Sequence, residues 1–223
     1  MSRALACAAL AMCFASCRAG DVGLTQSNSN NSATTSTDSN VKRGVKPEPD
    51  SQAVVLEVES GGFSYGRIVI ELYPNVAPKM VERFKRLVQE GFYNGTAFHR
   101  VSASTGVVQG GDPNSKDNDP SNDGLGGSPY DDVPAEFSDI PYERGVVGAA
   151  RSQDINSANS QFFITLRRVP MWDNKYTVFG RVVEGMDNAQ TIAGAPTQPA
   201  HPENPADKII IKSATLQPRS NFK

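Results

Sequence analysis

The sequence predicts a mainly β protein, in which short antiparallel strands close into a barrel that two helices cap. Three observations predict this fold class: short apolar or alternating segments recur through the second part of the chain, turn residues separate them, and only two segments have a helical pattern. Many short strands favour a closed antiparallel barrel, because closure removes the strand edges that an open sheet leaves exposed.

Composition limits the kind of protein this is. The chain has 223 residues, of which 38% are hydrophobic and 21% are charged, as expected for one soluble domain with an additional segment. A formal net charge of -2 leaves no surplus of positive charge, so the sequence predicts no binding to nucleic acid through phosphate contacts. Every cysteine lies at or before Cys17, so the remaining chain has no internal disulfide.

The N-terminal residues 1–17 predict a signal peptide. A basic start at Arg3 precedes an apolar run that ends in small residues before Cys17, and the run is too short to span a bilayer. Two kinds of processing stay open. Either the chain is cleaved near Cys17 without lipid, or the signal is of the bacterial lipoprotein type and Cys17 is lipidated. An organelle transit peptide is less favoured, because such peptides are longer and richer in Arg.

The next segment, residues 18–51, predicts a disordered tether. Thirteen of the sixteen residues from Thr25 to Asn40 are Ser, Thr or Asn, a composition that cannot bury apolar surface. A flexible chain of this length reaches about 30 Å. The sequence therefore predicts an exported protein of the cell envelope or periplasm, with an organelle lumen as the alternative, and a tether of this reach would suit a lipid anchor if Cys17 is lipidated. The folded domain is expected at 52–217, with a tail at 218–223.

Order begins with two alternating segments, 54–58 and 67–72, that predict a β-hairpin. The connection contains the pattern G-x-S-x-G around Ser64, which in hydrolases places a nucleophile between a strand and a helix. Because a strand follows here, we expect Ser64 to belong to a glycine-rich hairpin and not to a catalytic site.

The two helices are predicted at 77–90 and 186–192. In the first, Pro78 suits the first turn, Phe84 belongs to an apolar stripe, and Gly91 ends the helix. The segment 112–134 is rich in turn residues and predicts a long loop. Part of it is similar to the start of a calcium loop, but Tyr130 stands where a Glu is needed, so no metal site is expected. Further short strands are expected in the segments 92–100, 106–111, 145–150, 161–165, 176–183 and 209–211.

The chain from Val54 to Leu216 resembles a cyclophilin, a peptidyl-prolyl cis-trans isomerase. The resemblance implies an eight-stranded antiparallel barrel capped by two helices, proline-containing polypeptides as substrates, and no cofactor. It rests on seven blocks in order, at 71–78, 91–96, 98–100, 109–112, 136–137, 160–165 and 178–182.

The chemistry of such an enzyme follows from its substrate. An X-Pro bond rotates over a barrier of about 18–20 kcal/mol, and no bond is made or broken. A catalyst needs an apolar pocket for the ring and a cationic donor near the prolyl nitrogen, whose lone pair localises as the amide twists. The resemblance implies that Arg100 is this donor, that Gln109 holds the substrate backbone, and that Phe163 is the floor of the pocket. On spacing alone, Arg100 would be read as a surface ion pair.

The resemblance also implies a wider substrate groove. His99 is expected to contact backbone, since amide rotation transfers no proton, and Val107 is expected to line the pocket. The main chain at Ala150 and Arg151 is expected to pair with the bound peptide as an added strand. The groove is completed by Gln161, Trp172 and Tyr176.

Departures from the family pattern predict reduced catalysis. Eight residues separate Arg100 from Gln109, one more than is usual, and Gly106 stands where an aromatic lines the pocket. Losing that ring removes about 1–3 kcal/mol of contact with proline, unless another side chain fills the gap. Met171 takes the usual Trp position, so cyclosporin binding is not expected. We therefore expect a monomeric isomerase that assists folding of exported proteins, or a tethered chaperone that binds proline peptides with weak or no isomerase activity.

Overall fold

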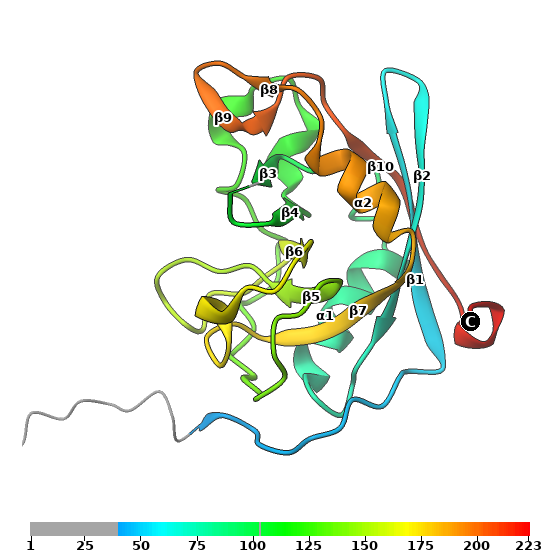
Figure 1. Ribbon diagram of the computed structural model, residues 1–223, viewed down its shortest axis with the longest axis vertical. Helices are drawn as coiled ribbons and strands as arrows, with labels where there is room; N and C mark the ends of the chain where they lie inside the picture. The colour runs from blue at the N-terminus through cyan, green and yellow to red at the C-terminus, as the bar shows by residue number, and fades with distance from the viewer. Residues whose placement is uncertain (1–39, 103) are drawn as a thin grey trace, which may run out of the picture. The chain divides into compact units, whose positions relative to one another are not determined.

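The computed structural model describes residues 40–102 and 104–223 (Figure 1). The predicted signal peptide, Cys17 and most of the predicted tether lie outside the described residues. Within the described ranges, no helix combines the length and apolar character needed to cross a membrane.

One antiparallel sheet of eight strands dominates the fold, in the order β10-β1-β2-β7-β5-β6-β4-β3, and β8 and β9 form a separate pair. Helix α1 packs against β10 and β7, and α2 packs against β2 and β4 (Figure 1). The strands are β1 Gln52–Ser60, β2 Phe63–Leu72, β3 Arg100–Ser102, β4 Val107–Gly110, β5 Val146–Ala149, β6 Phe162–Thr165, β7 Val178–Glu184, β8 Thr197–Gln198, β9 His201–Pro205 and β10 Ile210–Pro218. The helices are α1 Pro78–Gln89 and α2 Met186–Ala193, with 3₁₀ turns at Pro113–Lys116, Pro120–Asn122, Pro170–Trp172 and Arg219–Asn221.

The prediction of a closed barrel was wrong. The sheet curls into a half-barrel, and its two end strands, β10 and β3, do not pair with each other as strands. Strand β3 has only three residues. The chain just before it meets the start of β10 through an isolated bridge between Ala97 and Ile210 and through three backbone hydrogen bonds that join residues 95–98 to 209–211. These contacts lie outside β3, so the strand ladder itself is not closed at this edge.

The long strands behave as their alternation predicts. Leu56 and Ile70, on β1 and β2, are fully buried in the main core, and the β1–β2 hairpin forms as expected. Ser64 lies in this hairpin, where its hydroxyl accepts a hydrogen bond from the Gly66 amide at 3.0 Å. The outer face is covered by Phe222, from the segment predicted as a tail, which packs on Val55 and neighbouring residues.

Helix α1 follows its predicted boundaries. Pro78 occupies the first turn, and the buried stripe includes Phe84, as expected. The sequence did not indicate the N-terminal cap, which is the carboxylate of Glu136. It accepts hydrogen bonds from the backbone amides of Lys79 at 3.2 Å and Met80 at 3.0 Å. These are donors that a helix leaves unpaired at its start, and a negative charge there also complements the helix dipole.

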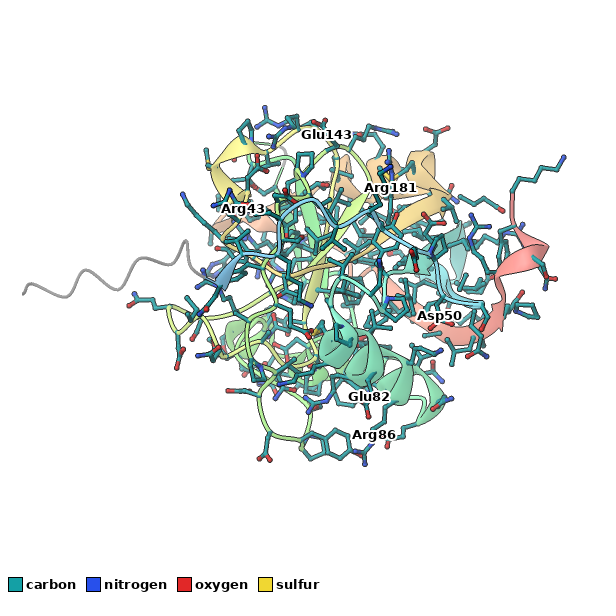
Figure 2. All side chains as sticks on the ribbon, turned by 90° about the horizontal axis from the view of Figure 1, so that it is seen from below. Arg43, Asp50, Glu82, Arg86, Glu143 and Arg181 are labelled. Atoms are coloured by element: carbon teal, nitrogen blue, oxygen red, sulfur yellow. The ribbon has the colours of Figure 1, made fainter. Side chains whose placement is uncertain are left out.

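Contacts with the domain begin before residue 52. Lys42 bridges Ser138, and its amide donates to the Phe137 carbonyl at 2.9 Å. Val45 packs against an apolar cluster of the domain, and the Asp50 amide donates to the Leu72 carbonyl at 2.8 Å. Figure 2 shows the segment crossing this face between the labelled residues Arg43 and Asp50. Residues 42–51, expected as the end of the tether, therefore lie against the domain.

Candidate functional site

Three predicted site residues form one row across neighbouring strands. Arg100 on β3 lies opposite Gln109 on β4, and Gln109 lies opposite Phe163 on β6. Residues directly opposite each other in antiparallel strands project to the same face and contact one another. The sheet register therefore brings a cationic, an amide and an aromatic side chain together.

The polar half of the row is a chain of hydrogen bonds. Arg100 Nη1 donates to Gln109 Oε1 at 3.4 Å, and Gln109 Nε2 donates to Gln161 Oε1 at 3.0 Å. Gln161 Nε2 donates in turn to the carbonyls of Gly124 at 2.9 Å and Gly126 at 2.8 Å. These hydrogen bonds orient the side-chain amide of Gln109 and connect it to the long loop that was predicted from the sequence.

The loop is itself held near the site by Asp112. The Asp112 carboxylate is fully buried and accepts hydrogen bonds from the backbone amides of Gly124, Gly126 at 3.1 Å and Asn114 at 2.8 Å. Buried carboxylates are stable when several donors compensate for lost solvation. The loop therefore provides fixed backbone next to Gln161.

The apolar half is an aromatic cluster around Phe163, which is only 3% exposed. The centre of its ring lies 4.7 Å from that of Trp172, and 5.6 Å from those of Tyr176 and Tyr142. Val107 is buried in the same cluster. The contacts with Trp172 and Tyr176 are edge-to-face and that with Tyr142 is tilted. Such contacts hold the rings in defined orientations, which suits the wall of a pocket.

Gly148 is part of this arrangement, although no sequence pattern indicated it. It lies opposite Phe163 on β5, and a Cβ atom at this position would be 2.3 Å from Cζ of Phe163. No such contact is sterically possible, so the absent side chain leaves the room that the Phe163 ring uses.

A pocket of about 190 Å³ lies beside the polar half of the row, lined by Gln109, Gln161, Ala150, Arg151 and the loop at 124–126. The Ala150 amide donates to the Gln161 carbonyl at 2.9 Å, so this amide is already engaged within the protein. The Arg151 guanidinium lies 4.6 Å from the centre of the Tyr176 ring. Both residues therefore border the groove.

His99 is the predicted residue that does not join the row. It is buried and lines a separate pocket of about 210 Å³, together with Phe98, Asp123 and Lys208. Burial lowers the pKa of His99, against the negative charge of Asp112, which raises it. The ring is therefore neutral near pH 7. Across the described residues, no cluster of three or more potential metal ligands occurs.

Arg167 lies against Gly106, the position at which the family pattern has an aromatic. This glycine has a φ of 75°, and an added Cβ would lie 2.5 Å from Cγ of Arg167. Arg167 donates to the Ser104 carbonyl, so its aliphatic carbons lie across the turn. Met171 is 66% exposed, and Trp172 packs on Phe163 instead.

Sequence reasoning missed one charged neighbour of the row, Glu203 on β9. Arg100 Nε donates to Glu203 Oε2 at 2.7 Å, and the Ser102 hydroxyl donates to the other carboxylate oxygen. The Arg100 hydrogen bond, partly opposed by burial, lowers the pKa of Glu203. No local pattern indicated this pair, because the two residues are 103 positions apart.

Comparisons with known proteins agree with this geometry. The family model described as cyclophilin type peptidyl-prolyl cis-trans isomerase/CLD matches residues 54–216. A probable peptidyl-prolyl cis-trans isomerase of Brucella suis is 50% identical over 169 residues, which cover 74% of this chain and 82% of that protein. A peptidyl-prolyl cis-trans isomerase of Schizosaccharomyces pombe is 40% identical over 154 residues, covering 69% of this chain and 95% of that protein.

A solved structure shows the same likeness. It is the cyclophilin type peptidyl-prolyl cis-trans isomerase of Cryptosporidium parvum, crystallised in the presence of the dipeptide Ala-Pro. The TM-score is 0.64 at 29% identity, and the match covers 74% of this chain and 98% of that chain. With the family model spanning most of the domain and a row that joins a cation to an aromatic pocket, the chain belongs to the cyclophilin-type peptidyl-prolyl cis-trans isomerase family.

Proposed function

We propose that the row of Arg100, Gln109 and Phe163 is where this enzyme rotates the X-Pro bonds of its substrates. The observation that carries the proposal is the register, which places a cationic fork two strands away from an apolar floor. A proline ring seated on Phe163 would bring its amide toward the polar half of the row.

The proposed mechanism is stabilisation of the twisted amide. Rotation decouples the nitrogen lone pair from the carbonyl. A fixed hydrogen-bond donor near this nitrogen therefore stabilises the transition state more than either planar form. Arg100 stays charged at any working pH and presents its donors in a rigid plane. Gln109, oriented by Gln161, is placed to hold the substrate backbone while the bond turns.

The neighbouring groove extends the proposal to the residues that flank proline. The Ala150 carbonyl and Arg151 border the pocket beside Gln109, where an extended peptide could add as a strand. His99 is neutral and lines a separate pocket, so we assign it a structural role beside Arg100 and no part in acid–base chemistry.

A substitution of Arg100 tests the mechanism. Exchange between cis and trans forms of a prolyl peptide, measured by NMR on the full chain, should slow about 100-fold in Arg100→Ala, as for loss of one oriented donor. Arg67→Ala is the matched control, because Arg67 is an exposed arginine in an ion pair with Glu184. Equal rates in wild type and Arg100→Ala would overturn the mechanism, and peptide binding without acceleration would establish a binding protein instead.

We further propose that the substrates are exported proteins whose folding the enzyme assists, and that it acts as a monomer on a lipid anchor at Cys17. The signal-like residues 1–17 and the polar segment that follows support this proposal. Mass spectrometry of the mature N-terminus is the test. Diacylated Cys17 in membrane fractions is expected, together with release of the protein by Cys17→Ala, whereas a mature chain that retains Met1 would contradict export.

A further inference from the structure

Arg100 is held from outside the main sheet. Its Nε donates to Glu203 at 2.7 Å, and its Nη1 donates to Gln109 at 3.4 Å. A guanidinium is planar, so fixing Nε and one Nη group fixes the direction of every remaining donor. Among the described residues, the other Arg100 donors have no hydrogen-bond partner and stay available to a substrate.

The carboxylate has its own support. Glu203 lies on β9, which pairs only with β8 and contacts β3. Two further hydrogen bonds hold β8 and β9 together: Gln198 Nε2 donates to the Pro205 carbonyl at 3.2 Å, and the Ala206 amide donates to the Pro196 carbonyl at 2.8 Å. The second Glu203 oxygen accepts a hydrogen bond from the hydroxyl of Ser102, which lies two residues after Arg100 on β3. The carboxylate is therefore anchored at both oxygens.

We propose that Glu203 is a positioning residue for the isomerase: it holds the Nε edge of Arg100, so that the Nη edge faces the amide of a bound X-Pro bond. This inference rests on the proposed role of Arg100. A free arginine side chain has several rotatable bonds, and ordering it at each turnover would raise the barrier to rotation. Glu203 removes that cost before substrate binds, which is preorganisation.

Partial exposure makes geometry, and not charge neutralisation, the main effect of Glu203. The Arg100 side chain is 34% exposed and that of Glu203 is 39% exposed, so solvent screens the pair. Glu203 binds Arg100 through Nε, so it does not occupy the Nη groups that we propose donate to the substrate.

The test uses Glu203→Ala and Glu203→Gln in the full chain, with cis–trans exchange of a prolyl peptide measured by NMR at several peptide concentrations. Glu203→Ala should lower kcat about 10-fold and leave KM within about 2-fold, because the transition state loses more than the ground state. Glu203→Gln should retain most of kcat, since its amide oxygen can still accept from Arg100 Nε. Glu184→Ala, which removes an exposed carboxylate paired with Arg67, controls for general effects of losing an ion pair.

A double-mutant cycle separates this inference from the proposed function. In an Arg100→Ala background, Glu203→Ala should cause no further loss, because it acts only through Arg100. If Arg100→Ala slows exchange but Glu203→Ala leaves it unchanged or faster, positioning is overturned and the mechanism stands. Equal losses in Glu203→Gln and Glu203→Ala would also overturn positioning, and a rate unaffected by Arg100→Ala would overturn the proposed function itself. Circular dichroism melting of each variant confirms that the compared chains are folded.

Discussion

The two ends of the eight-stranded sheet differ in strand length and in the chemical character of their side chains. We call β10, β1 and β2 the long end and β6, β4 and β3 the short end. Strands β10, β1 and β2 have 9, 9 and 10 residues, and their buried side chains are almost entirely apolar. Strands β6, β4 and β3 have 4, 4 and 3 residues, and one of their faces carries Phe163, Gln109 and Arg100.

This contrast separates the strands that stabilise the fold from those that carry the proposed site. Long ladders bury continuous apolar surface, which is the main source of folding free energy. Short strands end early, so loops and the β8–β9 hairpin can reach the row, as the contacts of Gln161 and Glu203 show. A side chain on the long end should therefore affect stability alone, whereas an equally buried one on the short end should affect activity as well.

The largest expected effect is on the long end. Leu56 on β1 is fully buried, so Leu56→Ala should cost about 2–5 kcal/mol of unfolding free energy through lost transfer energy and a cavity. Urea denaturation measures this loss, and cis–trans exchange per folded molecule should be unchanged. Phe63→Ala is the control, since Phe63 is 79% exposed and its removal should change stability by less than about 0.5 kcal/mol.

On the short end, Phe163→Leu should lower activity more than stability. The smaller side chain keeps much of the burial, but it loses aromatic contacts with Trp172 and the ring on which we propose that proline is seated. Loss of about 1–3 kcal/mol of contact predicts a decrease of about 5- to 150-fold in kcat/KM. Steady-state kinetics beside urea denaturation provides the comparison, and an unchanged kcat/KM would place the proline pocket elsewhere.

Two glycines with positive φ, Gly62 and Gly106, allow the same substitution to be compared at the two ends of the sheet. Gly62 in the β1–β2 hairpin has a φ of 84° and open space around it, whereas Gly106 has Arg167 against it. An alanine should cost about 1–2 kcal/mol at either position because of the left-handed backbone, and more at Gly106, where Arg167 must move. Thermal melting of both variants tests this. In an Arg167→Ala background, the excess cost at Gly106 should disappear, and a persistent excess would assign it to another contact.

The smallest expected effect concerns Asp50, which ties the N-terminal segment to α1. Burial raises the pKa of Asp50, but the Lys85 ammonium at 2.8 Å and the Gln52 amide outweigh it, so the folded pKa lies below 3.8. A lowered carboxyl pKa adds stability above the unfolded pKa, and this stability is lost as pH falls through the folded pKa.

Asp50→Asn should therefore destabilise the domain by up to about 1 kcal/mol at pH 7, and progressively less below pH 3.8. Urea denaturation across this pH range measures the difference. Glu59→Gln, which breaks the more exposed pair with Lys212, is the control and should cost less. A difference between wild type and Asp50→Asn that does not shrink in acid would show that the charge contributes nothing.

The local elements could be predicted from the sequence, and the resemblance to a known family indicated the residues of the candidate row. Proline and glycine marked both ends of α1, alternation marked the β1–β2 hairpin, and the motif resemblance pointed to Arg100, Gln109 and Phe163. These features were readable because each depends on residues a few positions apart or on a contiguous motif.

The contacts between distant segments could not be predicted from the sequence and became visible in the folded structure. The open edge between β10 and β3, the docking of residues 42–51 and of Phe222, and the pairing of Arg100 with Glu203 all join residues far apart in the chain. Such contacts depend on the register of the whole sheet and on the exact length of its strands, and local periodicity encodes neither.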